Sequence, residues 1–337
     1  MNPVQIYSGN YRPGIYRIRL PLAGKKPGPV NVYLFKGKDS VALLDTGTIA
    51  TWRYLEDRLK TIGIGFRDID QIVMSHGHVD HYGAARRILD LGGGKARVYA
   101  HPADTKAIET GSDVPASAYR RFLRLTGTPL RYHLGIVPMF FLFRMRMGRG
   151  CPVHVPLRDG DSLGLGDYRA TIIETPGHTR GSVCFHLERE KLLFAGDHIL
   201  PHITPNAFPM LETDGPPRRS SQKEFYGSLE KIEHLGQLTV YPAHGQTIKN
   251  FSRIHAMYKA SFSQRQQAIL DTIRRHPGQT VYTMALGHFP EIRQSRRFLL
   301  ELYLAIAEVF THIQVLESLG RVRTSFDNHI LRVEYTP

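Results

Sequence analysis

Cysteine is scarce in this chain of 337 residues, which has only two, Cys151 and Cys184. Two cysteines cannot build the disulfide framework that stabilises many small secreted domains. Cys184 lies in the strand-like run SVCFHL, which favours a buried and inert thiol. The cysteine content therefore gives no support for a disulfide-stabilised fold.

Long hydrophobic runs are also missing. The most strongly apolar stretch, LGIVPMFFLF at residues 134–143, contains a proline and is far shorter than the roughly 20 residues that cross a bilayer. The start, MNPVQIYSGNYRPG, has no basic segment leading into an apolar core and no small-residue cleavage site, so we see no secretory signal. We therefore expect a cytoplasmic protein without a transmembrane segment.

Acidic residues are outnumbered by basic ones, 30 against 44, which gives a formal net charge of +14. Such an excess favours anionic partners such as nucleic acid, anionic lipid surfaces or phosphate-bearing substrates. A solvated basic surface without such a partner is an equally open interpretation. The length and the 42% of hydrophobic residues are enough for a sizeable core, so we expect one large domain or two.

The pattern of strands and helices changes near residue 250. Before this point, β-rich runs such as VNVYLF and SVALLDTG alternate with helical segments, which indicates an α/β domain. After it the spacing of apolar residues is helical, and Gly320 is well placed to end the last helix. The final run RVRTSFDNHILRVEY predicts a β-hairpin that turns at Asp327 and Asn328. We predict a catalytic domain over residues 1–250 and a small, mainly helical, winged-helix-like domain over residues 251–337.

Possible metal ligands are concentrated at the ends of predicted strands. The run DQIVM is followed by SHGHVDHYG, which places three histidines and an aspartate within residues 75–83. The strand-like runs ATIIETPGH, KLLFAGD and LTVYPAH also end in a histidine or an aspartate. A sheet holds the loops at its strand ends rigid, so their side chains can converge, and these imidazoles and carboxylates suit two divalent metal ions. The residues are His76, His78, Asp80, His81, His178, Asp197 and His244.

The order of these residues resembles the metallo-β-lactamase superfamily, whose hallmark is His-x-His-x-Asp-His followed by a later His, an Asp and a final His. The resemblance spans residues 16–246. It implies an αββα sandwich, in which two mixed sheets pack back to back with helices outside. By position, it assigns the first metal ion to His76, His78 and His178, the second to Asp80, His81 and His244, and the bridge between them to Asp197.

Three further residues have roles that the resemblance suggests. Asp45, in ALLDTGT, matches an aspartate that braces the metal-binding loop, with a plain turn residue as the alternative. His198 directly follows Asp197 and is, with Asp80, a candidate catalytic side chain; the alternative is a loop residue without a role. His101 ends another strand-like run, and we expect it to cap a helix or to pack rather than to bind metal.

The ligand set and the resemblance imply a hydrolase with two divalent metal ions. Metal binding lowers the pKa of water from about 15.7 toward about 7, so a hydroxide that bridges the two ions attacks an electrophilic carbonyl or phosphorus at neutral pH. Nitrogen and oxygen ligands suit zinc, and iron or manganese would also bind. The oxygen-reducing di-iron relatives carry a carboxylate in place of His78 and a fused flavin domain, so redox chemistry is not expected.

Two regions outside the ligand set bear on the substrate. The tail AEVFTHIQVLESLGRV resembles the C-terminal module of the subgroup that contains the lactamase-like endoribonuclease and glyoxalase II-like hydrolases. Residues 112–156 interleave aromatic and arginine side chains, and in relatives an insertion here often lies beside the metal cleft. We hypothesise a hydrophobic, basic lid that accepts an acyl or aromatic group and attracts a negative one. A helical hairpin packed on the core, or a homodimer interface, is the open alternative.

The sequence favours hydrolysis of a thioester, ester or lactone of a small molecule, because the ligand set is intact, the core is glyoxalase-like and the insertion is apolar. The alternative is a metal-dependent nuclease acting on single-stranded RNA or DNA, which the net charge and Arg321, Arg323 and Arg332 of the predicted wing suggest. The large clamping insertion of the superfamily's processing nucleases is absent, which argues against this alternative. A metal-binding regulatory protein without significant turnover is the third possibility.

Overall fold

The structure is a computed structural model that describes residues 4–6, 14–22, 27–112, 114–212 and 215–337. The start of the chain, for which we expect no secretory signal, lies mostly outside these residues.

The chain forms two compact units, each assembled from separate stretches of sequence. Unit 1 comprises Met1–Asp113, Arg144–Pro205 and Ser228–Ile254, and unit 2 comprises Val114–Phe143, Asn206–Gly227 and His255–Pro337. A packing unit is not the same as an independently folding domain, so the predicted domain boundary near residue 250 stays a prediction. Much of the predicted insertion packs within unit 2.

The larger of two β-sheets in unit 1 has seven strands. In spatial order they are β1 (Val4–Ile6), β2 (Ile15–Leu20), β3 (Val30–Lys36), β4 (Val41–Leu44), β5 (Gln71–Val73), β6 (Arg97–Ala100) and β7 (Val155–Pro156). The strands from β1 to β4 pair antiparallel, and those from β4 to β7 pair parallel. The carboxyl ends of β4, β5 and β6 therefore meet at one edge of the sheet, where a site can form.

The smaller sheet of unit 1 has five strands. In spatial order they are β12 (Thr239–Pro242), β11 (Leu192–Gly196), β10 (Val183–Leu187), β9 (Tyr168–Glu174) and β8 (Ser162–Leu165). Only β11 and β12 pair parallel. Every residue of β11 is buried, which explains why its sequence, LLFAG, is apolar throughout.

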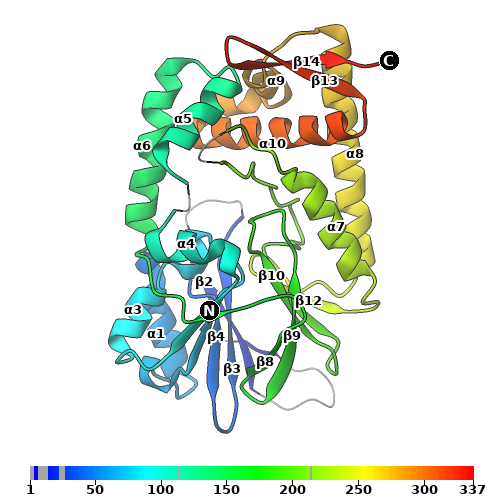
Figure 1. Ribbon diagram of the computed structural model, residues 1–337. Helices are drawn as coiled ribbons and strands as arrows, with labels where there is room; N and C mark the ends of the chain where they lie inside the picture. Colours follow the sequence, from blue (N-terminus) through cyan, green and yellow to red (C-terminus); the bar gives the residue numbers. More distant parts are fainter. Residues whose placement is uncertain (1–3, 7–13, 23–26, 113, 213–214) are drawn as a thin grey trace. The chain divides into compact units, whose positions relative to one another are not determined.

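The two sheets pack against each other around a shared aromatic core. Phe35 of β3 and Phe194 of β11 meet there edge to face, with ring centroids 5.0 Å apart. A second core covers the other face of the larger sheet, where α1 (Trp52–Lys60) buries Leu55 beside α3 (Ala85–Leu91). Figure 1 shows these two helices beside the larger sheet. The predicted fold class, mixed sheets with outer helices, is confirmed.

Unit 2 is built mainly from helices. They are α5 (Ala116–Leu125), most of α6 (Leu130–Met147), most of α8 (Phe251–Arg275), α9 (Val281–His288) and α10 (Phe298–Ser318), while α7 (Ser221–Glu233) is divided between the two units. Leu302, Ile306 and Val309 of α10 are buried in the core of this unit. Their spacing of three and four is the pattern that predicted a helix here.

One helix in the described part of the chain, α10, is long and apolar enough to cross a membrane. Within the structure, 67% of its most apolar window is buried, which is the pattern of a core helix. Residues 134–143, whose short apolar run predicts no transmembrane segment, form part of α6.

The predicted C-terminal hairpin is confirmed, with its turn displaced by one residue. Strands β13 (Val322–Asp327) and β14 (Ile330–Tyr335) pair antiparallel, and Asp327 is still part of the ladder. The turn consists of Asn328 and His329, not of Asp327 and Asn328. Asn328 and His329 have positive φ angles of 48° and 67°. Positive φ at both central residues matches the twist of the flanking strands. The winged-helix-like character of this module stays a prediction.

Candidate metal centre

The loop after β5 carries the first group of candidate ligands and is held in place from the neighbouring strand. Thr46, just beyond β4, donates its backbone N–H and its hydroxyl to the carbonyl of His81, both at 2.7 Å. The short helix α2 (Val79–Tyr82) ends at Gly83, where a Cβ atom would collide with the carbonyl oxygen of Met147. The glycine that closes the motif SHGHVDHYG is therefore needed for close packing of the backbone.

The seven predicted ligands converge at one edge of unit 1. They form three overlapping groups, in each of which the donor atoms lie within 4.8 Å of one another. The groups are His76, His78 and His178; His76, His81 and Asp197; and Asp80, His81 and His244. Because His76 and His81 each belong to two groups, the three groups are one continuous cluster.

Asp197 lies between His178 on one side and His81 and His244 on the other. Its Oδ2 atom is 3.5 Å from Nε2 of His178 and 3.7 Å from Nε2 of His81, and its Oδ1 atom is 3.4 Å from Nε2 of His244. The carboxylate thus reaches histidines on both sides of the cluster, as a carboxylate that bridges two ions would. Two ligand atoms on a tetrahedral zinc ion, each about 2.0–2.1 Å from the metal, lie about 3.3 Å apart. The observed spacings fit ligands of a shared ion.

Several buried atoms of the cluster make no hydrogen bond, namely Nε2 of His81, Nε2 of His244 and Oδ1 of Asp197. A buried polar atom without a partner costs about 1–3 kcal/mol. Divalent metal ions bound within the cluster would satisfy all three atoms, and the nitrogen and oxygen donors are those that zinc accepts. These residues therefore fit the metal that the resemblance implies.

Two of the histidines are held in the neutral form that binds metal. Burial, together with the neighbouring imidazoles, holds the pKa of His76 well below its ordinary value. Burial likewise lowers the pKa of His78 to about 3. Neither imidazole has to lose a proton before it donates a lone pair.

The carboxylates of the cluster favour a positive charge beside them. Burial acts to lower the pKa of His81, yet Asp197, Asp80 and Asp45 raise it well above its ordinary value. Burial acts to raise the pKa of Asp197, but His244 and His81 hold it well below its usual range. A metal cation would supply the charge that these carboxylates favour.

The predicted brace by Asp45 is confirmed. Its carboxylate accepts hydrogen bonds from the N–H and the hydroxyl of Ser75, both at 2.8 Å, and from Nδ1 of His81 at 2.9 Å. With Nδ1 engaged, His81 has only Nε2 left for a metal. Asp45 also has a φ of 60°, unusual for a residue other than glycine, at the turn that leads from β4 into the site.

Asp104 is part of the site, and the sequence motifs did not reveal it. It lies in the first turn of α4 (Pro102–Thr110) and is only 4% exposed. Its carboxylate accepts hydrogen bonds from Gly77 N–H at 2.7 Å, Gly181 N–H at 2.9 Å and the Thr179 hydroxyl at 2.6 Å. Gly77 separates the first two histidines of the motif and Thr179 follows the β9-loop histidine, so this carboxylate ties two ligand loops together. The only signal in the sequence was the run HPAD directly after a strand.

Replacing Asp104 with asparagine is expected to weaken metal binding by about 10- to 100-fold, the range typical of residues that support metal ligands. An asparagine side chain has one acceptor oxygen and cannot accept all three bonds. Metal affinity is measured by competition with a chromogenic chelator. Asp90→Asn is the matched control, because Asp90 pairs with Arg86 on the exposed side of α3 at 2.9 Å. Equal metal affinity in Asp104→Asn and the unaltered protein would contradict the brace.

Two other predicted residues lie outside the three ligand groups of the described chain. His101 caps α4, because its Nδ1 accepts from the N–H of Ala103 at 3.1 Å and its Nε2 donates to Glu174 at 2.8 Å. The prediction that His101 caps rather than ligates is confirmed. His198 is buried, and burial lowers its pKa to about 3, so it is neutral. The catalytic role of His198 stays a prediction.

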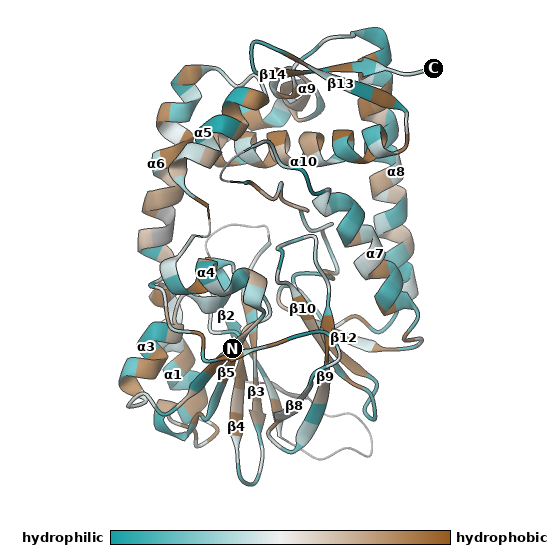
Figure 2. Ribbon diagram, in the orientation of Figure 1, coloured by the Kyte–Doolittle hydropathy of each residue, from teal (hydrophilic) through white to brown (hydrophobic). Residues whose placement is uncertain are grey.

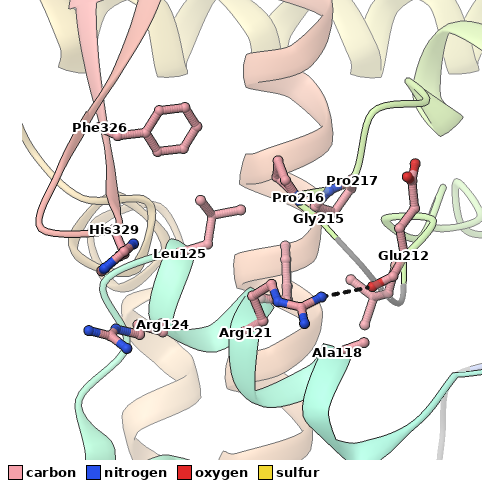
Figure 3. A pocket seen from close by; sticks show the side chains of 12 residues that line it. Ala118, Arg121, Arg124, Leu125, Glu212, Gly215, Pro216, Pro217, Phe326 and His329 are labelled. Atoms are coloured by element: carbon pink, nitrogen blue, oxygen red, sulfur yellow. Dashed lines mark hydrogen bonds between the residues drawn. The ribbon is translucent and has the colours of Figure 1, made fainter.

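Unit 2 has a cavity of its own, with a volume of about 400 Å³, formed by residues of that unit alone. Figure 3 shows its basic side, where Arg121 donates to the carbonyl oxygen of Glu212 at 3.3 Å and Arg124 lies nearby, with Phe326 on the opposite side. Glu212 is the one carboxylate among the described lining residues and is paired with Arg218 at 3.7 Å. This cavity lacks the donor set that unit 1 assembles.

Known proteins resemble the chain over this site and beyond it. A sequence model of the Metallo-beta-lactamase superfamily matches residues 26–244, which include all seven candidate ligands. The probable metallo-hydrolase YqjP of Bacillus subtilis (strain 168) is 25% identical over 301 residues, or 86% of this chain and 88% of that protein. The acyl-coenzyme A thioesterase MBLAC2 of Homo sapiens is 28% identical over 175 residues, which cover 50% of this chain and 57% of that protein.

A solved structure is also similar. It is a metallo-beta-lactamase family protein from Thermus thermophilus, with a TM-score of 0.80 and 28% sequence identity. The superposition covers 96% of this chain and 99% of the Thermus chain, so the likeness extends well beyond the residues that the family model matches.

Proposed function

The chain belongs to the metallo-beta-lactamase superfamily and is a metallo-hydrolase, and on this premise we propose that it hydrolyses thioesters of small molecules at a dinuclear metal centre. The observation that carries the proposal is the position of Asp197, whose carboxylate lies within 3.7 Å of His178 on one side and of His81 and His244 on the other. The similarity to a protein named as an acyl-coenzyme A thioesterase supports a thioester as the bond that is cleaved.

The residues divide into two sets of ligands that share one carboxylate. His76, His78 and His178 would hold one ion, Asp80, His81 and His244 the other, and Asp197 both. When bound, divalent ions, zinc by the nature of the donors, supply Lewis acidity and ionise water at neutral pH. The chain contributes no nucleophile of its own in this proposal.

The chain also fixes the orientation of its ligands before substrate arrives. Nδ1 of His81 is bonded to Asp45, and Nδ1 of His244 donates to the backbone carbonyl of Gly28 at 3.0 Å. Both histidines therefore present only Nε2 to the cluster. Ligand side chains that are already oriented need no rearrangement during the reaction. The activation free energy is therefore lower than in a site that must reorganise as charge develops in the transition state.

A substrate panel tests the reaction. Purified protein loaded with zinc is assayed on coenzyme A thioesters of short, medium and long acyl chains, on oxygen esters and lactones with the same acyl groups, and on single-stranded RNA. We expect turnover of thioesters, and its loss in His76→Ala, which removes one of the three histidines of the first ligand set. Cleavage of RNA without cleavage of thioesters would replace this proposal with the nuclease alternative. Two bound metal ions without turnover on any substrate would support the regulatory alternative.

A further inference from the structure

Large apolar side chains are exposed along helix α6. Leu130 and Leu134 are 72% and 75% exposed, and Phe141 and Leu142 are 55% and 52% exposed. Most of the large hydrophobic side chains that remain exposed in the described part of the chain lie on this helix. Figure 2 shows hydrophobic colouring along much of α6. Exposed apolar surface of this kind marks sites of interaction with a partner or a membrane.

Three of these side chains, Leu130, Leu134 and Phe141, gather on one side of the helix, and we call them the α6 stripe. With about 3.6 residues per turn, Leu130, Leu134 and Phe141 lie within about 40° of one another around the axis and span about 16 Å along it. His133 and Ile136 project from another side and are buried. Residues 130–143 of the helix thus pack into unit 2 through one face and leave the α6 stripe open.

Every charged residue of α6 is basic. Arg131, Arg144 and Arg146 lie within the helix and Arg149 follows it, whereas no aspartate or glutamate occurs between residues 130 and 147. Arg131 and Arg146 are exposed. A second copy of this chain docking through the same face would bring arginines together without a carboxylate to pair with them, which opposes a symmetric dimer. A surface of anionic lipid headgroups provides the complementary charge.

We propose that the α6 stripe docks the protein on an anionic lipid surface. The apolar side chains enter the boundary between headgroups and acyl chains, while Arg131 contacts lipid phosphates. The binding is peripheral, because the buried face of α6 keeps the helix within its unit. The net charge of +14 adds attraction at longer range. The proposal goes beyond the hydrolytic reaction and does not depend on which bond is cleaved.

Vesicle flotation tests the proposal with the full-length, metal-loaded protein. Vesicles of phosphatidylcholine alone are compared with vesicles that also contain phosphatidylglycerol. We expect at least about tenfold stronger binding to the anionic vesicles, and a loss of binding as added salt screens the charges. The variant Leu134→Ser/Phe141→Ser is expected to bind the anionic vesicles at least about tenfold more weakly, because two apolar side chains no longer leave water.

A matched substitution separates docking from general surface effects. Leu319→Ser removes an apolar side chain that is 61% exposed beyond the end of α10, and it should bind vesicles as the unaltered protein does. Circular dichroism and metal content confirm that each variant is folded. The proposal is overturned if the unaltered protein binds neither kind of vesicle. It is also overturned if light scattering shows a dimer that Leu134→Ser/Phe141→Ser dissociates while vesicle binding stays unchanged.

Discussion

Replacing Asp197 with asparagine is expected to reduce kcat for hydrolysis by at least about 1,000-fold, since a lost metal contribution of several kcal/mol corresponds to a factor of this size. The amide carries no charge and is a weaker metal ligand than a carboxylate, so it holds two divalent cations together poorly. Removing the negative charge also leaves His81 and His244 without their nearest shared counter-charge. Steady-state kinetics and elemental analysis of the same preparation measure both consequences.

The metal content of Asp197→Asn distinguishes a bridging role from a purely structural one. We expect bound metal to fall from two ions per chain to one or fewer, with KM changing less than kcat. Asp90→Asn, which removes a carboxylate from the exposed side of α3, should retain both the rate and the metal content. Full metal occupancy with an unchanged kcat in Asp197→Asn would rule out the bridge.

Stripping the metal with a chelator is expected to abolish hydrolysis and to lower the thermal unfolding temperature by about 10 °C. A ligand present at 1,000 times its Kd stabilises the folded state by about 4 kcal/mol, and each kcal/mol corresponds to about 2–4 °C in a domain of about 150–250 residues, the size range of unit 1. The loss follows because buried nitrogen and oxygen atoms of the cluster would again lack partners. Differential scanning calorimetry of the stripped and reloaded protein measures the shift.

Reloading the stripped protein is the internal control for this experiment. Two equivalents of zinc should restore both the rate and the unfolding temperature, whereas magnesium, which prefers oxygen ligands, should restore neither. An unfolding temperature that does not change on stripping would show that the cluster is stable without metal. Activity that survives complete stripping would contradict a metal-dependent mechanism.

The ligand cluster could be predicted from the sequence because its members follow apolar strands, and strand ends meet at a sheet edge. The same reasoning identified Asp45, which directly follows β4. Asp104 could not be found in this way. An aspartate in the first turn of a helix is common, because it complements the helix dipole, so its position alone carried no signal. Its role depends on two backbone N–H groups, of Gly77 and Gly181, that no sequence pattern reports.

Packing between distant segments was the part that local patterns could not provide. The spacing of apolar residues predicts the helix α10, yet the packing of α10 with α5 and α6 joins stretches more than 150 residues apart. The hairpin turn was displaced by one residue because Asp327 and Asn328 are both common in turns, and only the backbone angles decide between them. The sequence shows that basic and apolar residues occur together along α6, but it does not show which of them are exposed.

The carboxylate of Asp104 joins the loop after β5 to the loop after β9, because residues of both loops donate hydrogen bonds to it. A change in the sequence or length of one loop would disturb the position of Asp104, to which the other loop is also hydrogen-bonded. A side chain at Gly77 or Gly181 would also collide with Asp104. If either loop is replaced by the loop of a related enzyme, the first turn of α4, which carries Asp104, would therefore have to be replaced with it. Attempts to change the selectivity of this enzyme should start from segments that do not contact Asp104.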